Sequence, residues 1–227
     1  MKKSILFSVL VFSTALAFVG CKSNQNEPEA GGSSSGKSNG HEYVNLGLSV
    51  KWANMNVGAE SPEGYGSYFA WGETATKATY DWSTYFDTND GGNTFTKYNK
   101  KGGKTVLDPE DDAAHVNWGG SWRMPTKVEW QELIDNCTWT WTTQNGINGY
   151  KVTSNKAGYT DKFIFLPAAG DRYGSGLDAV GSYGYYWSSS LYESYSGSAW
   201  GLYFGLGGHG LTYFNRCLGQ SVRPVLP

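Results

Sequence analysis

The residues best suited to chemistry lie near the C-terminus, where apolar and small side chains alternate. Within residues 200–206, Trp, Leu, Phe and Leu occupy the even positions, and Gly, Tyr and Gly occupy the odd positions. Successive side chains of a β-strand point to opposite faces, so the even set is expected to face the core and the odd set the solvent. Exposed tyrosines are rigid, amphipathic rings that supply contact area at low entropic cost. The pattern therefore predicts ligand binding by surface contact.

The composition of the chain agrees with a contact surface rather than with a nucleic-acid site. The 227 residues include 10 Trp, 16 Tyr, 10 Phe and 31 Gly. Such a composition is common in recognition surfaces and also in loop-rich β folds. The formal net charge is −2 at pH 7, whereas binding to nucleic acid requires a basic face. We therefore expect no nucleic-acid partner.

The N-terminus has the layout of a secretory signal. Met1–Lys3 is a short positive segment, and residues 5–19 form an apolar run that is too short for a helix that stays in the membrane. The run ends at Gly20–Cys21, which resembles a bacterial lipobox, although Phe18 stands where Leu is usual. The resemblance implies cleavage before Cys21 and acylation of this cysteine. Several acyl chains on one residue would anchor the protein stably to the membrane.

A polar segment separates this signal from the rest of the chain. Residues 22–40 contain no large apolar side chain and many Gly, Ser and Asn, so they cannot bury enough surface to fold. We therefore expect a signal peptide at residues 1–20, a flexible tether at residues 21–40 and one domain at residues 41–227. That domain is long enough to bury a sizeable core. The expected location is the cell envelope, with a lipid anchor in the outer membrane and exposure at the cell surface.

Residue types that could act in catalysis or bind a metal are few and widely spaced. No Cys or His has the spacing of a zinc site, and Gly174–Gly176 lacks the Gly-x-Ser-x-Gly spacing of a nucleophile elbow. In an exported protein, Cys137 and Cys217 either join in a disulfide or remain two thiols. We predict no catalytic residue, no metal and no cofactor.

Two segments carry the signals of helix starts. Asp108–Asp112 has an N-cap aspartate, proline at the first helical position and acids in the first turn; a calcium-binding cluster is the alternative interpretation of these carboxylates. Thr126–Glu129 is a capping box. The helix that follows it has an apolar stripe, which consists of Val128, Trp130, Leu133 and Ile134.

The remaining elements are expected to be β-strands. A hairpin over residues 43–52 turns near Gly47, a strand covers residues 65–71, and a polar, irregular excursion covers residues 73–106. Further strands are predicted at residues 138–142, 150–153, 163–166, 185–189, 199–206, 210–214 and 221–225. Because the helices do not alternate with single strands, the pattern predicts an α+β fold with a mainly antiparallel sheet.

Several sequence motifs within residues 41–227 together resemble those of a bacterial lipoprotein family. The family is the major paralogous domain called FISUMP, common in Bacteroidetes, and its motifs include a "WRxPTxxEWxxL" helix start. The resemblance implies a C-type-lectin-like fold of the formylglycine-generating-enzyme subtype, which does not fix the function. The matching segments are Trp118–Thr126, Glu129–Trp130, Leu133, Phe165–Gly170, Gly184–Ser190 and Ser221–Val225.

Residues 187–227 more specifically resemble the variable proteins of diversity-generating retroelements. In those systems a reverse transcriptase rewrites adenines at the 3′ end of a gene, and a lectin-like fold displays the changed residues. The shared motif residues are Tyr186–Ser190, Ala199–Trp200, Arg216–Cys217 and Gly219–Val225. We expect Trp187 and Trp200 in the core, and Arg216 paired with an acid or bonded to loop carbonyls.

The same resemblance implies a set of variable, ligand-binding positions, which the family's templates typically encode as Asn. Each residue type found at these positions can be reached from an Asn codon by changing its two adenines. His209 joins the predicted site as a polar contact. The implied variable positions are Tyr195, Gly197, Ser198, Gly201, Tyr203, Gly205, Gly208, Gly210, Thr212, Tyr213, Phe214, Asn215 and Leu218.

Three functions compete at this stage. The first is a diversified binder of a protein or glycan on another cell, a phage or a host surface. The second is a fixed carbohydrate-binding lectin or adhesin subunit, without the Glu-Pro-Asn motif of calcium-dependent animal lectins. The third is an enzyme related to formylglycine-generating enzymes, whose chemistry needs a reactive cysteine pair near the C-terminus, where only Cys217 lies. The first is the expected function, without catalysis.

Overall fold

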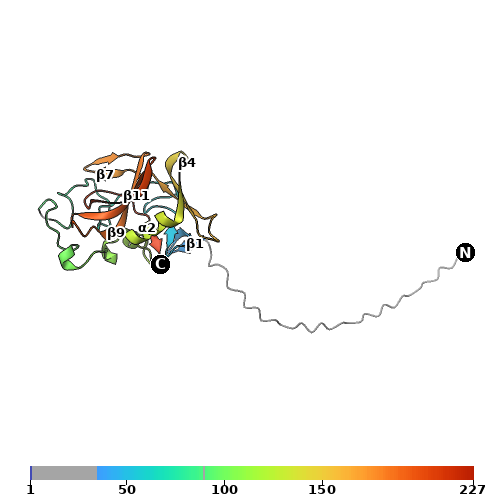
Figure 1. Cartoon of the computed structure of the whole chain (residues 1–227), viewed down its shortest axis with the longest axis horizontal. Coiled ribbons are helices and arrows are strands. Elements are labelled where there is room, and N and C mark those ends of the chain that lie inside the picture. The colour runs from blue at the N-terminus through green and yellow to red at the C-terminus, as the bar shows by residue number, and fades with distance from the viewer. Residues whose placement is uncertain (2–34, 89) are drawn as a thin grey trace, which may run out of the picture. The chain divides into compact units, whose positions relative to one another are not determined.

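The structure is a computed structural model that describes Met1, residues 35–88 and residues 90–227 (Figure 1). The predicted signal peptide after Met1, the acylation site Cys21 and the tether up to residue 34 lie outside the described residues. Among the residues that are described, no helix has both the length and the apolar character needed to cross a membrane.

The described residues form a mixed fold with little helix and many short strands. The named strand pairs are all antiparallel. They form four small sheets with the orders β1-β2-β3-β12, β11-β10-β9, β4-β5-β6 and β7-β8. The predicted α+β class with mainly antiparallel pairing is confirmed. The strands are β1 Ser35–Ser38, β2 His41–Val44, β3 Lys51–Ala53, β4 Cys137–Gln144, β5 Ile147–Ser154, β6 Phe163–Pro167, β7 Asp171–Tyr173, β8 Gly176–Asp178, β9 Tyr183–Leu191, β10 Ser198–Gly205, β11 Gly208–Asn215 and β12 Val225–Leu226.

The folded region begins before residue 41, where the tether was expected to end. β1 and β2 form a hairpin in which Ser38 lies opposite His41. The two residues between them, Asn39 and Gly40, both have positive φ, at 46° and 84°. Asn-Gly is the preferred pair for such a two-residue turn, because both central positions need positive φ. Residues 35–40 are therefore part of the β1–β2 hairpin, despite their tether-like composition.

The strand predicted at residues 65–71 is wrong, whereas the long excursion after it is confirmed. In the first segment only Phe69 makes a β-bridge, to Gln220 near the C-terminus. The described part of residues 73–106 contains one single-turn 3₁₀ helix, Lys100–Gly102, and isolated bridges at Tyr80 and Val106. Backbone hydrogen bonds at Tyr80 and Thr105 hold the excursion to other segments, and side-chain contacts with Arg216 add to them.

The first predicted helix starts later than expected. Pro109–Asp111 forms only a single 3₁₀ turn, and α1 Ala113–Trp118 follows it. The N-cap of α1 is Asp112, whose carboxylate accepts from the backbone N–H groups of Ala114 and His115. A second oxygen of the same carboxylate accepts from Met124 N at 2.8 Å. Asp112 therefore performs the capping role that was assigned to Asp108.

The second predicted helix is confirmed, with one error in its apolar stripe. α2 Lys127–Asn136 begins with a capping box in which Thr126 and Glu129 each accept from the other's backbone N–H. Trp130 and Leu133 are fully buried, but Val128 is 69% exposed. Position 128 lies in the first turn, on the outer side of the helix. The helix runs directly into β4 at Cys137.

The C-terminal segment is fixed to the excursion by a buried ion pair. Arg216 Nη2 lies 2.8 Å from Asp87 Oδ2, and both side chains are removed from solvent. Arg216 also donates to the carbonyl oxygens of Tyr98 at 3.1 Å and Ser196 at 3.0 Å. The expectation that Arg216 is paired and bonded to loop carbonyls is confirmed.

The acidic partner of this pair belongs to the irregular excursion. Asp87 Oδ1 accepts from Thr96 N, Thr96 Oγ1 and Lys97 N, at 3.0, 2.5 and 3.0 Å. These bonds and the Arg216 guanidinium hold the pKa of Asp87 below its ordinary value, although burial alone would raise it. The carboxylate is therefore the point where the excursion and the C-terminal segment are joined.

A second buried arginine joins three other segments. Arg223 donates to Asn56 Oδ1 at 2.9 Å, to Ala53 O at 3.0 Å and to Phe165 O at 2.8 Å. Burial lowers the pKa of Arg223 to about 10. Its guanidinium thus bonds to oxygens of the last residue of β3, of a loop residue after β3 and of the middle of β6. Arg223 thereby joins β3 and the segment that follows it to β6.

Removal of the Asp87 charge should destabilise the fold strongly. In Asp87→Asn the Arg216 cation remains buried without its carboxylate, which in other proteins costs about 3–5 kcal/mol. We expect the free energy of unfolding, measured by urea denaturation at pH 7, to fall by this amount. Asp161→Asn breaks an exposed ion pair with Lys162 and should cost less than about 1 kcal/mol. Equal losses in the two variants would contradict the structural role of Asp87.

Candidate ligand-binding surface

One face of the sheet β11-β10-β9 is buried at one end and open to solvent at the other. Ala199 and Trp187 lie at the buried end and belong to the core. At the other end Tyr203 lies opposite Tyr185 of β9 and Gly210 of β11. Tyr203 is 40% exposed. The open end is therefore the part of this face that a ligand can reach.

Three tyrosines lie at the open end, and the Phe214 ring, which comes from the residue opposite Ala199, contacts one of them. We call Tyr183, Tyr185, Tyr203 and Phe214 the aromatic face. Tyr183 is 47% exposed, and Tyr185 and Phe214 are half-buried. The rings of Tyr183 and Tyr185 stack with centroids 6.2 Å apart, and Tyr185 meets Phe214 edge to face at 5.5 Å. Such contacts restrict the rings, so the face presents ordered contact area.

Glycines beneath the rings let them lie close to the sheet. A Cβ atom on Gly205 would be 2.8 Å from the Tyr183 ring. A Cβ atom on Gly201 would be 3.1 Å from the Phe214 ring and 2.7 Å from the carbonyl oxygen of Tyr186. The contacts of 2.8 and 2.7 Å would require a shift, and the contact of 3.1 Å is tighter than an ordinary van der Waals contact. The small residues of the sequence pattern therefore act as supports for the rings, covered by them rather than exposed.

The rim of the aromatic face carries negative charge. Asp171 of β7 lies opposite Asp178 of β8. Burial, followed by the charge of Asp178, raises the pKa of Asp171. Burial also raises the pKa of Tyr185, and the Asp171 carboxylate adds to this shift. Gly170 makes a β-bridge with Gly184, so Asp171 follows a residue that lies beside the part of β9 that carries Tyr183 and Tyr185.

The predicted site residues differ widely in exposure, so the expectation that they form one outward-facing set is wrong. Alternation along β10 places residues 201 and 205 on the aromatic face, but the rings cover both. The exposed members are Tyr195, Tyr203, Tyr213 and Asn215. The half-buried members are Gly208, His209, Gly210, Thr212, Phe214 and Leu218. The buried members are Gly197, Ser198, Gly201 and Gly205.

The predicted residues also lie on both faces of the sheet. Tyr203 and Phe214 belong to the aromatic face, whereas Tyr213 lies opposite Trp200 on the other face. His209 is on that other face as well, where its ring stacks on Trp139 with centroids 4.3 Å apart. Burial lowers the pKa of His209, which favours its neutral form. This histidine is held in a packed position.

Sequence reasoning missed two members of the aromatic face. These are Tyr183 and Tyr185, and both precede Tyr186, the first shared motif residue of the variable-protein resemblance. Tyr185 was predicted as part of the strand at residues 185–189, and Tyr183 was assigned no role. The signal was present, because residues 183, 185 and 187 are all aromatic at a spacing of two. What the sequence did not reveal is that β9 pairs with β10 in the register that places Tyr185 opposite Tyr203.

The inward side of β10 departs from expectation at both ends. Leu202 and Phe204 are fully buried as predicted. Leu206 is 76% exposed, because it lies in the two-residue turn between β10 and β11. Trp200, expected in the core, is only half-buried. Its indole lines a solvent-accessible pocket.

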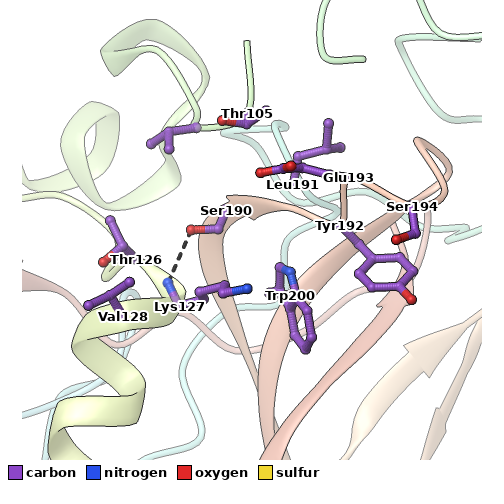
Figure 2. Close-up of a pocket in the computed structure, with 11 residues that line it drawn as sticks. Thr105, Thr126, Lys127, Val128, Ser190, Leu191, Tyr192, Glu193, Ser194 and Trp200 are labelled. Carbon is purple, nitrogen blue, oxygen red and sulfur yellow. Dashed lines mark hydrogen bonds between the residues drawn. The ribbon is translucent and has the colours of Figure 1, made fainter. Parts of the chain in front are cut away.

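The Trp200 pocket lies where three segments meet, and it has a volume of about 450 Å³. Its walls are the start of α2, residues 105–106 and residues 190–194 at the end of β9 (Figure 2). The Lys127 ammonium lies 4.3 Å from the centroid of the Trp200 ring. Tyr192 meets Trp200 edge to face at 5.2 Å and stacks on Tyr213 at 4.0 Å. The pocket thus combines aromatic walls with a cation.

The two cysteines in the described residues are separate, buried thiols. Cys137 and Cys217 belong to different hydrophobic clusters. Burial raises the pKa of Cys137 to about 12 and that of Cys217 to about 11. A thiol is reactive as the thiolate, so burial opposes reactivity at both sites. Of the two alternatives for this pair, the structure has the free thiols.

The acidic segment interpreted alternatively as a calcium site does bring carboxylates together. Oxygen atoms of Asp108, Glu110 and Asp111 lie within 4.8 Å of one another. Lys97 already makes ion pairs with Glu110, at 3.4 Å, and with Asp111. The cluster is therefore neutralised in part by a cation of the chain itself.

Comparisons of the chain with family models, with curated proteins and with solved structures gave no match.

The supporting role of Gly201 can be tested with a matched pair of glycine variants. Gly201→Ala should lower the free energy of unfolding by about 1–3 kcal/mol, because the new methyl group must displace backbone or the Phe214 ring. Gly210→Ala lies on the same face, where the nearest atom would be 3.5 Å away. This variant should be neutral or more stable by up to about 1 kcal/mol. Urea denaturation measures both, and equal destabilisation would contradict the proposed packing.

Proposed function

We propose that this protein is a lipid-anchored cell-envelope protein whose domain binds a ligand through the aromatic face. The observation that carries the proposal is that tyrosines of the aromatic face are exposed, whereas the large side chains of the framework beneath them are fully buried. Tyr183 and Tyr203 are accessible, while Trp187, Arg216 and Arg223 are removed from solvent. Aromatic anchors on a rigid support lose little entropy on binding and supply much of the energy of interfaces.

The proposed fold within the α+β class is the C-type-lectin-like fold of the formylglycine-generating-enzyme subtype. Its support is the FISUMP resemblance together with the arrangement of the domain ends. β12 pairs with β3, so the last strand closes the sheet that the first strands begin. Two short helices and small antiparallel sheets agree with this proposal.

We further propose that the binding surface is diversified, as in the variable proteins of diversity-generating retroelements. The support is the motif resemblance, together with the exposure of Tyr203 on the aromatic face and of Tyr195 and Asn215 outside it. Side chains at these positions can change while the buried motif residues keep their contacts. Gly201 is expected to vary least, because any side chain there meets the Tyr186 carbonyl oxygen. The proposed ligand is a protein or glycan on another cell, a phage or a host surface.

Diversification can be tested by sequencing the 3′ end of the gene and its flanking DNA in sister strains. We expect differences at the codons of the exposed positions, a near-copy of the segment that differs at adenines, and a neighbouring reverse transcriptase gene. The codons for Trp187, Arg216 and Arg223 should be invariant, because their side chains are buried. An identical tail in all strains, with no near-copy nearby, would favour a fixed lectin.

Binding by the aromatic face can be tested on an array of bacterial and host glycans and surface proteins, with the full chain as probe. Tyr203→Ala should weaken each signal at least tenfold, because it removes an exposed ring of the face without touching the core. Tyr173→Ala is the matched control, since Tyr173 is an exposed tyrosine of β7 outside the face. Signals that survive in Tyr203→Ala and vanish in Tyr173→Ala would contradict the proposal.

A further inference from the structure

The pocket beside Trp200 is separate from the aromatic face and needs its own explanation. Trp200 pairs with Tyr213 in the sheet register, and alternation along β10 directs its side chain away from the side that carries Tyr203. The volume of about 450 Å³ lies within the range of about 300–1,000 Å³ that is usual for small-molecule sites. A ligand of the size of one or two sugar rings is therefore the relevant class.

An ordered aromatic wall forms one side of this pocket. The Trp200 indole lies between Lys127 and Tyr192 (Figure 2). Tyr192 is itself held by the stacked ring of Tyr213, with an interplanar angle of 8°. Tyr213 also contacts Trp200 edge to face at 6.4 Å. Since these rings fix one another, the wall is formed before a ligand arrives, which lowers the entropic cost of binding.

The pocket also contains a cation without an acidic partner. Within residues 35–88 and 90–227, the Lys127 ammonium makes no ion pair, and its contact is the face of the Trp200 ring. Lys127 is the sole basic residue among those that line the pocket. An anionic group that enters can therefore pair with the ammonium without displacing a carboxylate of the chain.

The other polar groups that line the pocket can form hydrogen bonds with hydroxyl groups of a ligand, and they offer no second cation for another anionic group. Glu193 lines the same pocket, and an ionised carboxylate only accepts hydrogen bonds. Ser190 Oγ accepts from Lys127 N at 3.1 Å, so its own hydrogen is available to donate into the pocket. Thr105 and Ser194 add hydroxyls that both donate and accept.

We propose that the Trp200 pocket binds an acidic sugar, that is, a sugar ring that carries a carboxylate. The carboxylate pairs with Lys127, the C–H face of the ring packs on Trp200 and Tyr192, and the ring hydroxyls donate to Glu193. A neutral sugar leaves Lys127 unpaired. A simple aliphatic carboxylate leaves the aromatic wall and Glu193 without partners. Uronic acids and sialic acids share the required chemistry.

The proposal is tested by titrating the full chain with glucuronate, N-acetylneuraminate, glucose and acetate, and following the Trp200 indole N–H by NMR. We expect saturable shifts with one or both acidic sugars, and binding at least tenfold weaker for glucose and acetate. Whichever acidic sugar binds more tightly identifies the source of the carboxylate. Glucose that binds as tightly as the acidic sugars would overturn the proposal. Acetate that binds as tightly would do the same, and would point to carboxylates of proteins instead.

Variants separate this pocket from the aromatic face. Lys127→Gln should weaken acidic-sugar binding at least tenfold and abolish its preference over glucose. The matched control is Lys151→Gln, because the Lys151 ammonium lies 4.2 Å from the centroid of the Phe163 ring, outside the pocket. Lys127 is exposed, so its replacement leaves the core intact, and thermal unfolding verifies this. Unchanged affinity in Lys127→Gln would refute the proposal.

The same titration distinguishes the two proposed sites. Tyr203→Ala removes a ring of the aromatic face and should leave the affinity for acidic sugars unchanged. Loss of that affinity in Tyr203→Ala, with Lys127→Gln unaffected, would place the sugar on the aromatic face and overturn the assignment of the pocket. Failure of all four small ligands to bind would overturn the pocket proposal alone, since the aromatic face is tested by the larger ligands on the array.

Discussion

The fold depends above all on the buried ion pair between Arg216 and Asp87. Residues 73–106 form almost no regular structure, so few backbone hydrogen bonds of their own hold them to the domain. The guanidinium replaces those bonds, because it reaches Asp87, the carbonyl oxygen of Tyr98 and the carbonyl oxygen of Ser196 at once. It also lies over the rings of Trp71 and Phe95, each with its centroid 4.7 Å away. A buried charge costs several kcal/mol in desolvation, and here every one of these neighbours offsets part of that cost. Arg216 thus joins the excursion to the segment that directly follows β11.

The shape of the aromatic face depends on glycines beneath the rings as well as on strand alternation. Alternation determines which side of the sheet a residue faces, but it does not determine whether that side is covered. Gly201 and Gly205 face the open side and are nevertheless buried, since the rings of Phe214 and Tyr183 lie on them. The rings gain packing area against the backbone and keep their outer faces in water. The surface is therefore built from pairs of a large and a small residue on neighbouring strands.

Much of the framework was predictable because its signals are local. The capping box at Thr126, the buried run of residues 164–166 and the need of Arg216 for partners follow from residue types over short distances, whereas Phe163 at the start of that run is exposed. The β1–β2 hairpin also had a local signal, the pair Asn39–Gly40, which the polar composition around it concealed. The site was less predictable, because it depends on register between distant segments. The register between β9 and β10 decides which tyrosine lies opposite Tyr203. Segments far apart in the sequence meet around Trp200. Neither arrangement can be read from a short stretch of sequence.

The pairing of β12 with β3 has a practical consequence for presentation of the domain. Because β1, β2, β3 and β12 form one sheet, the chain enters the domain and reaches Pro227 through the same layer. Figure 1 shows the C-terminus close to β1. A fluorescent protein or purification handle fused after Pro227 would consequently emerge near Lys37 and Ser38 of β1, which line one pocket together with Leu226 and Pro227. Such a fusion extends from the sheet that closes the fold, and the β10–β11 hairpin belongs to a different sheet. We therefore expect that a ligand can still reach the tyrosines of the β10–β11 hairpin in such a fusion protein.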